Sequence, residues 1–332
     1  MRSPLLVTAL AAAVLAGCPN KPKPDQQAAA RDAAPVTTNV APKESPPDPA
    51  HGKELVATFQ CNRCHDGTGH PPAADNKHCV HCHAKIMADE FDAPAASIAR
   101  WKPRVKELAH APSLEATGKR FTRKWVTSYL LQPTDLRPHL HQYMPRLAIT
   151  PADARDIAAY LVPDEDPPAV EAPPELAGAD LGKGRQLVET KGCGSCHVFT
   201  GVAAIPSSAP PAMDGKEFER GHKLAPDLRF ARERMSASKM IAWLSDPKAV
   251  KPDTPMPKVN LSPSEVKDLA AYLLTAEITP PPPKAKLARL PVLTRKVTFK
   301  EVDEKVFHRT CWHCHSEPDY AIGDGGPGNS GG

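Results

Sequence analysis

Four short motifs of cysteine and histidine carry most of the chemistry that this sequence offers. Each motif has two cysteines separated by two residues, and a histidine directly follows the second cysteine. The motifs comprise Cys61, Cys64 and His65; Cys79, Cys82 and His83; Cys193, Cys196 and His197; and Cys311, Cys314 and His315. Thiol and imidazole groups in this arrangement are typical of metal sites, disulfides or a covalently held redox group.

The Cys-x-x-Cys-His pattern is the attachment signature of c-type haem. Two thiols add to two vinyl groups of the porphyrin, and the next residue supplies the imidazole that binds the iron. Zinc binding and disulfides compete, because Cys61 to Cys82 also resembles a zinc-ribbon spacing and an exported chain can oxidise its cysteines. Neither a zinc site nor a disulfide requires a histidine directly after the second cysteine of each motif. With 14 histidines in 332 residues, four chance matches are on the order of 3 in a million, so we expect four covalently attached haems c.

An internal repeat indicates which elements surround these motifs. Residues 144–161 and 256–273 align without a gap, and each copy runs from Met-Pro to Ala-Tyr-Leu. Each copy contains a helix start, with Thr150 or Ser262 as the N-cap and a proline at the first helical position. Apolar residues then recur at helical spacing, so we expect one amphipathic helix in each copy.

The first copy contains an insertion. The offset between copies is 132 residues from Cys61 to Cys193 but only 114 from Pro112 to Pro226, so the first copy holds 18 additional residues. The motif that begins at Cys79 lies in this interval. We interpret it as an extra haem motif inserted into an otherwise ordinary module.

These features resemble the class I c-type cytochromes, twice over. The shared elements are a helix before Cys-x-x-Cys-His, a later Met-Pro and a C-terminal helix with Ala-Tyr-Leu, over residues 51–162 and 179–276. The resemblance implies a mainly α fold of tandem class I cytochrome c-like helical modules, joined by Pro-rich linkers, with little or no β-sheet. It also implies that the first and last helices of each module cross at a glycine and an aromatic residue, Gly52 with Tyr160 and Gly184 with Tyr272.

The resemblance further implies the iron ligands. The proximal ligands would be His65, His83, His197 and His315. The distal ligand would be Met144 for the haem on Cys61 and Cys64, and Met256 for the haem on Cys193 and Cys196. The haem on Cys79 and Cys82 has no Met-Pro of its own, so it takes another ligand from this module or stays five-coordinate. The nearby candidates, among which the sequence does not choose, are Met87, His70, His78, His81, His110, His139 and His141.

The fourth motif is followed by only 17 residues, too few and too rich in glycine for a third module. Either the chain continues beyond Gly332 or this haem packs on the other domains. We expect a signal peptide (1–17), a lipidated cysteine with a disordered tether (18–50), a two-haem module (51–162), a linker (163–178), a one-haem module (179–276), a second linker (277–299) and a C-terminal haem segment (300–332).

The N-terminus predicts export. Arg2 precedes an apolar run over residues 5–15 that is too short to span a membrane. The run ends in Leu-Ala-Gly-Cys18, which resembles the bacterial lipobox, although an ordinary signal peptide could also contain a cysteine. Without Cys18, the eight remaining cysteines divide evenly among the four motifs. We therefore expect lipidation of Cys18 and anchoring to a bacterial membrane, facing the periplasm.

Composition and charge limit the classes of function that this chain can have. Net charge is only +4 and the basic residues are spread along the chain, so nucleic-acid binding is not expected. We expect an electron-transfer protein rather than an enzyme, which passes single electrons between haems and to redox partner proteins in the cell envelope. The alternatives are a haem peroxidase or reductase, which would use the haem without an evident distal ligand, and a cytochrome subunit of a respiratory complex.

Overall fold

The computed structural model describes residues 45–141, 144–164, 166–167, 173–207, 213–280 and 293–311. Within these residues there are thirteen α-helices and no β-strand, which confirms the mainly α fold. The expected signal peptide, Cys18, Cys314 and His315 lie outside the described residues.

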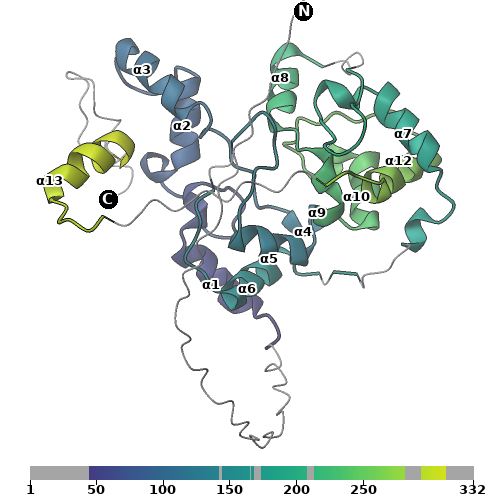
Figure 1. Cartoon of the computed structure of the whole chain (residues 1–332), viewed down its shortest axis with the longest axis horizontal. Helices are drawn as coiled ribbons and strands as arrows, with labels where there is room; N and C mark the ends of the chain where they lie inside the picture. Colours follow the sequence, from purple (N-terminus) through teal and green to yellow (C-terminus); the bar gives the residue numbers. More distant parts are fainter. Residues whose placement is uncertain are drawn as a thin grey trace, which may run out of the picture. The chain divides into compact units, whose positions relative to one another are not determined.

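Three helices make up the core of the first module. Helix α1 (Pro49–Thr58) packs against α6 (Pro151–Leu161), which also packs against α5 (Arg123–Leu131), and a short helix α4 (Thr117–Arg120) precedes α5. The two helices α1 and α6 run side by side in Figure 1. Buried apolar side chains such as Val56 join them. As expected, Thr150 is an N-cap, and it forms a capping box with Asp153.

The inserted motif has a small core of its own. A single turn, η2 (Asp75–Lys77), leads into α2 (Cys79–Met87), which packs against α3 (Ala95–Val105). The buried residues between these two helices are Ile86, Ile98, Trp101 and Val105. The insertion is therefore a helical hairpin with a separate apolar cluster, and the cluster includes Cys82 at its edge.

The second module repeats this plan. Helix α7 (Leu181–Thr190) packs against α12 (Pro263–Thr275), which also packs against α10 (Ala237–Ser245). Ser262 and Glu265 form the capping box that starts α12. The remaining elements are η3 (Pro174–Leu176), η4 (Cys193–Ser195), α8 (Gly215–Leu224), η5 (Leu228–Phe230), α9 (Ala231–Arg234) and α11 (Pro247–Val250).

A glycine permits the close helix crossing in each module. A Cβ atom added to Gly52 would lie 2.0 Å from the carbonyl oxygen of Asp156, and one added to Gly184 would lie 2.2 Å from that of Asp268. The same Cβ on Gly184 would be 2.7 Å from the Cβ of Tyr272, as the resemblance implied. Only glycine lets the two backbones approach this closely.

The first module departs from that expectation in one respect. The closest atoms to Gly52 belong to the backbone of Asp156 and Ile157, not to Tyr160. The ring of Tyr160 lies instead against Gly69, and its hydroxyl donates a hydrogen bond to the carbonyl of Thr68, 3.0 Å away. Tyr160 therefore fixes the loop after the first haem motif.

The two modules are in direct contact. The backbone N–H of Thr122 donates to the carbonyl of Arg234 (2.9 Å), and the ammonium of Lys239 donates to the carbonyl of Phe121 (2.8 Å). The guanidinium of Arg234 also lies over the ring of Phe121, 4.7 Å from its centre. These contacts join α9 and α10 of the second module to the start of α5.

The C-terminal segment leads into the fourth motif. Helix α13 (Phe299–Val302) continues as a π-helical stretch, η6 (Asp303–Cys311). The guanidinium of Arg295 holds the carboxylate of Glu301 through two hydrogen bonds of 2.7 and 2.6 Å. In the part of the chain that the structure describes, no helix has the length and apolar character needed to cross a membrane.

Candidate functional site

The motif of the second module is a tight turn that follows α7. Gly192 has a positive φ of 81°, and the 3₁₀ turn η4 begins at Cys193. The N–H groups of Cys196 and His197 both donate to the carbonyl of Cys193, at 3.2 and 2.9 Å. The hydroxyl of Ser195 donates to the carbonyl of Gly192 at 2.6 Å. The turn therefore presents two thiols and one imidazole from consecutive positions.

A backbone carbonyl orients the imidazole of His197. Its Nδ1 lies 2.8 Å from the carbonyl oxygen of Pro226, which can only accept, so Nδ1 carries the proton. Burial lowers the pKa of His197, which keeps the ring neutral. The lone pair of Nε2 is therefore available to a metal, in the manner of a ligating histidine held by a second group.

The carbonyl of Pro226 is itself held in place. The buried carboxylate of Asp227 accepts hydrogen bonds from the N–H groups of Thr200 and Arg229, both at 3.0 Å. The N–H of Leu228 donates to the carbonyl of Val198 at 2.9 Å. These bonds tie the segment at Pro226 to the residues that follow the motif.

The first motif repeats the arrangement. Gln60 takes the left-handed conformation (φ 52°) that Gly192 takes in the second module, and the N–H of His65 donates to the carbonyl of Cys61 at 2.9 Å. The Nδ1 of His65 lies 2.8 Å from the carbonyl of Pro112, and burial lowers the pKa of this imidazole. The equivalence of His65 and His197 thus extends to the residue that orients each ring.

The inserted motif has a different backbone but the same contact. Its cysteines lie in the first turns of α2, not in a 3₁₀ turn. The Nδ1 of His83 nevertheless lies 3.1 Å from a backbone carbonyl, that of Leu108. The thiols of Cys64 and Cys79 are hydrogen bonded, so this motif touches the first one.

Both predicted methionine ligands pack beside their motifs. Met256 and Cys193 contact the same apolar cluster in the second module, and Met144 and Cys61 contact the same cluster in the first. The indole N–H of Trp243 donates to the sulfur of Met256 at 3.0 Å. A thioether sulfur has a second lone pair, so this bond leaves Met256 able to bind a metal.

The histidines near the inserted motif have varied surroundings. His70 is hydrogen bonded through Nε2 to the carbonyl of Lys53 (2.9 Å), and the ring of His139 stacks on that of His222 at 4.0 Å. Burial and the nearby Lys223 lower the pKa of His110 to about 4. The side chains of His78 and His81 lie beside Asp66, and Met87 is exposed. The distal ligand of this haem therefore stays a prediction.

Arginines with unpartnered buried atoms fit an anionic group. The Nε atoms of Arg120 and Arg234 are buried and have no hydrogen-bond partner in the described part of the chain. Burial and the neighbouring Arg137 lower the pKa of Arg120 to about 10, and burial, Arg137 and Arg120 lower that of Arg234 to about 9. Buried cations need an acceptor, and haem carries two propionates. Together with the thiols and the oriented imidazoles, these residues fit haem.

Sequence reasoning did not find the groups that orient the three histidines. Pro112 and Pro226 belong to the repeated segment, which was the available signal, but a carbonyl of any residue can accept this bond. Leu108 has no counterpart in the repeat, and nothing in the sequence marks it.

Comparison with known proteins identifies one part of the chain. Residues 181–277 match the family model described as Cytochrome c. No curated protein and no solved structure matches the chain. The matched segment contains Cys193, Cys196, His197 and Met256 in the arrangement described above. Residues 181–277 are therefore a domain of the Cytochrome c family, whose members hold haem c covalently and transfer electrons.

Proposed function

We propose that the chain is a tetrahaem c-type cytochrome that carries single electrons in the bacterial cell envelope. One repeated observation supports this proposal. In each of the three motifs whose histidine the structure describes, Nδ1 lies beside a backbone carbonyl, at 2.8 Å for His65, 3.1 Å for His83 and 2.8 Å for His197. The same use of the ring in three places favours one common role, the proximal ligand.

The chain's residues would hold and tune the bound group. When bound, haem supplies a one-electron Fe(III)/Fe(II) couple. The cysteine thiols would attach it, the histidine Nε2, directed by its carbonyl partner, would bind the iron, and Met144 and Met256 would be the other iron-binding residues in their modules. The apolar clusters beside the motifs exclude water, which favours the less charged reduced state.

The haem count tests the proposal. Pyridine haemochrome absorbance, set against protein concentration, should give four haems per chain. The double variant Cys79→Ala, Cys82→Ala should give three and leave the spectra of the other haems unchanged. A count near two in the unmodified protein, or zinc bound to the cysteines, would contradict the assignment.

The same spectra separate an electron carrier from a haem enzyme. A carrier with both axial positions filled gives low-spin haem only, whereas a peroxidase or reductase needs an open position for its substrate. A stoichiometric high-spin component that binds cyanide or peroxide would favour the enzyme. Its absence would support the electron carrier.

We also propose that a lipid on Cys18 anchors the protein to the membrane. The support is the sequence Leu15-Ala16-Gly17-Cys18 after the apolar run. Several acyl chains together hold a protein firmly at a membrane. Cys18→Ala should therefore move the haem-stained band to the soluble fraction or block maturation. A mature variant that still sediments with membranes would count against the anchor.

A further inference from the structure

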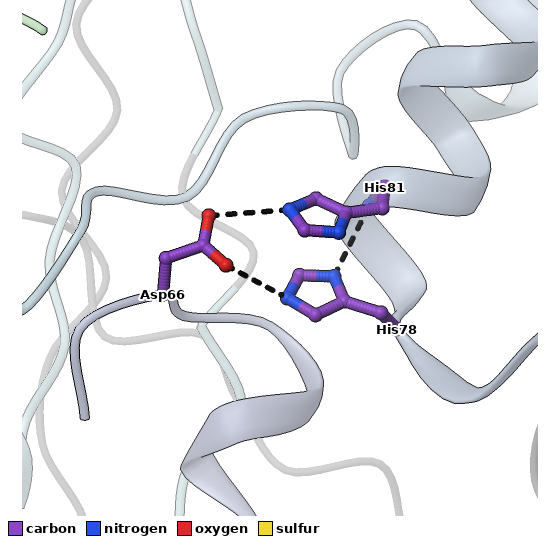
Figure 2. A group of neighbouring side chains, drawn as sticks. All are labelled: Asp66, His78 and His81. Carbon is purple, nitrogen blue, oxygen red and sulfur yellow. Dashed lines mark hydrogen bonds and ion pairs between the residues drawn. The ribbon is translucent and has the colours of Figure 1, made fainter. Parts of the chain in front are cut away.

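We propose that Asp66, His78 and His81 form a binding site for a divalent transition-metal ion, separate from the haem-attachment residues. One atom from each side chain can be chosen so that all three lie within 4.8 Å of one another. The Nε2 atom of His78 is 3.5 Å from Oδ1 of Asp66, and that of His81 is 3.2 Å from Oδ2. Figure 2 shows both imidazoles directed at the carboxylate.

These distances suit a tetrahedral ion. Bonds from Zn²⁺ to nitrogen or oxygen are about 2.0–2.1 Å long, so neighbouring ligand atoms of a tetrahedron are about 3.3 Å apart. The two imidazole rings are stacked with their centres 3.5 Å apart and their planes within 12° of parallel, so the more exposed ring of His81 would tilt for both Nε2 lone pairs to meet at one ion. The two nitrogen–oxygen distances are close to this value, and all three donor atoms lie within 4.8 Å of one another, so small side-chain movements would bring them around one ion.

The environment of His78 points independently to a ligand. Its side chain is only 1% exposed, and its Nε2 atom has no hydrogen-bond partner among the residues that the structure describes. A buried polar atom without a partner is costly, and the nearest acceptor, Asp66, is too distant for a good hydrogen bond. A metal between the two side chains would satisfy both.

Metal binding would require a change of tautomer at His78. In the structure, Nδ1 of His78 accepts a hydrogen bond from the N–H of His81 at 3.2 Å, which places the ring proton on Nε2. With a metal on Nε2, the ring proton would move to Nδ1. The hydrogen bond by which His78 caps the start of α2 would then be lost. The start of α2 would keep the backbone bond from the N–H of Cys82 to the carbonyl of His78 (3.0 Å).

The donor set indicates the class of ion. Two imidazoles and one carboxylate resemble the three protein ligands of zinc sites that keep a fourth position open. Magnesium and calcium prefer oxygen ligands throughout. Asp66 and His81 are exposed, so water can reach the fourth position. The ion would lie between the first two motifs, because Asp66 follows His65 and His78 precedes Cys79.

Equilibrium dialysis of the holoprotein tests the site. The protein, first stripped with a chelator, is dialysed against zinc sulfate at micromolar concentration, and zinc and iron are counted by mass spectrometry. We expect the unmodified protein to bind one zinc per chain. In both Asp66→Asn and His81→Gln, the affinity for zinc should be at least about 10-fold lower. Both residues are exposed, so these variants should fold, whereas His78→Gln could disturb the buried cap.

A matched control uses the other histidine–aspartate pair of this module. Nδ1 of His51 lies 2.8 Å from the carboxylate of Asp156, but among the residues that the structure describes no third ligand group joins this pair. His51→Gln should therefore bind zinc as the unmodified protein does. Failure of the unmodified protein to bind zinc, or equal binding by all three variants, would overturn the proposal. So would a loss of low-spin haem in His81→Gln, because that imidazole would then be an iron ligand.

Discussion

The thiols of Cys64 and Cys79 are hydrogen bonded to each other, although they belong to different motifs. This bond, together with burial, raises the pKa of the Cys64 thiol. Both thiols are proposed attachment points, so two haems would be attached at adjacent atoms of one module. The proposed carrier would then contain one closely coupled pair of redox sites in addition to the sites of the second module and of the fourth motif.

The ligand of the first haem can be tested by Met144→His. Histidine in place of methionine lowers the reduction potential of a haem. We expect one high-potential component to move to lower potential, and the component that depends on Met256 to stay unchanged. Redox titration of the purified protein with spectral deconvolution measures both.

Two further variants make this test specific. Met256→His should move the other high-potential component and spare the first. Met87→Leu should move neither, because Met87, at the end of α2, is a candidate ligand of the inserted haem alone. If Met144→His leaves the high-potential signal intact, Met144 is not the distal ligand.

The helix crossing predicts a large effect of Gly184→Ala. The new Cβ would lie 2.2 Å from the carbonyl oxygen of Asp268, a backbone atom that cannot move away by a change of rotamer. Helices α7 and α12 would have to separate, at a cost of about 1–3 kcal/mol of stability. Thermal and denaturant unfolding should show the loss.

Gly215→Ala is the matched control for that substitution. Gly215 begins α8, and a Cβ there would meet nothing within 4 Å. Its stability should stay within about 0.5 kcal/mol of the unmodified protein. Equal stability of both alanine variants would show that α7 and α12 do not cross at Gly184.

A pH-dependent contribution to stability is expected from His51. Its hydrogen bond to Asp156 raises the pKa of the imidazole above 6.5. A group whose pKa is higher in the folded than in the unfolded state stabilises the fold. This contribution is complete at a pH below the unfolded-state pKa, and it is lost as the pH rises through the folded-state pKa. His51→Gln should therefore lower the melting temperature more at pH 5.5 than at pH 8.5. The effect should be small because the pair is exposed. The opposite pH trend would contradict the assignment.

The sequence predicted the helix starts and one helix crossing, because residue types at single positions determine these features. Thr150 and Ser262 were predicted as N-caps from their spacing to proline and an acid, and both form capping boxes in the structure. The resemblance to class I cytochromes also implied a helix crossing at Gly184. A close approach of two backbones requires glycine, so the residue type itself marks this position. In these cases the residue type itself limits the conformation.

Contacts between distant residues could not be predicted in this way. The approach of Cys64 to Cys79 depends on how the hairpin α2–α3 returns to the first motif, and no residue type requires that path. The sequence likewise does not mark Leu108 as the partner of His83, because every residue has a carbonyl that could accept this bond. The cluster of Asp66, His78 and His81 also forms only when the insertion folds back on the first motif.

The last prediction concerns the bond between Trp243 and Met256. The indole N–H draws electron density from the sulfur, which makes Met256 a weaker donor to a ferric iron and favours the ferrous state. Trp243→Phe keeps most of the ring but removes the donor, so the potential of that haem should fall. A net hydrogen bond contributes about 0.5–1.5 kcal/mol, and 1.4 kcal/mol corresponds to about 59 mV for one electron. The decrease should therefore be roughly 20–60 mV.

The equivalent measurement in the other module is the control for this prediction. Trp125 of α5 stacks on Tyr129 at 5.0 Å in the first module, and Trp125→Phe should leave the potential of the Met256 haem unchanged. Melting temperatures of both variants show whether a change comes from general loosening of the fold. A potential that rises in Trp243→Phe, or falls equally in both variants, would show that the indole hydrogen bond does not tune this ligand. A fall confined to Trp243→Phe would identify Met256 as the distal ligand and Trp243 as the residue that sets its donor strength.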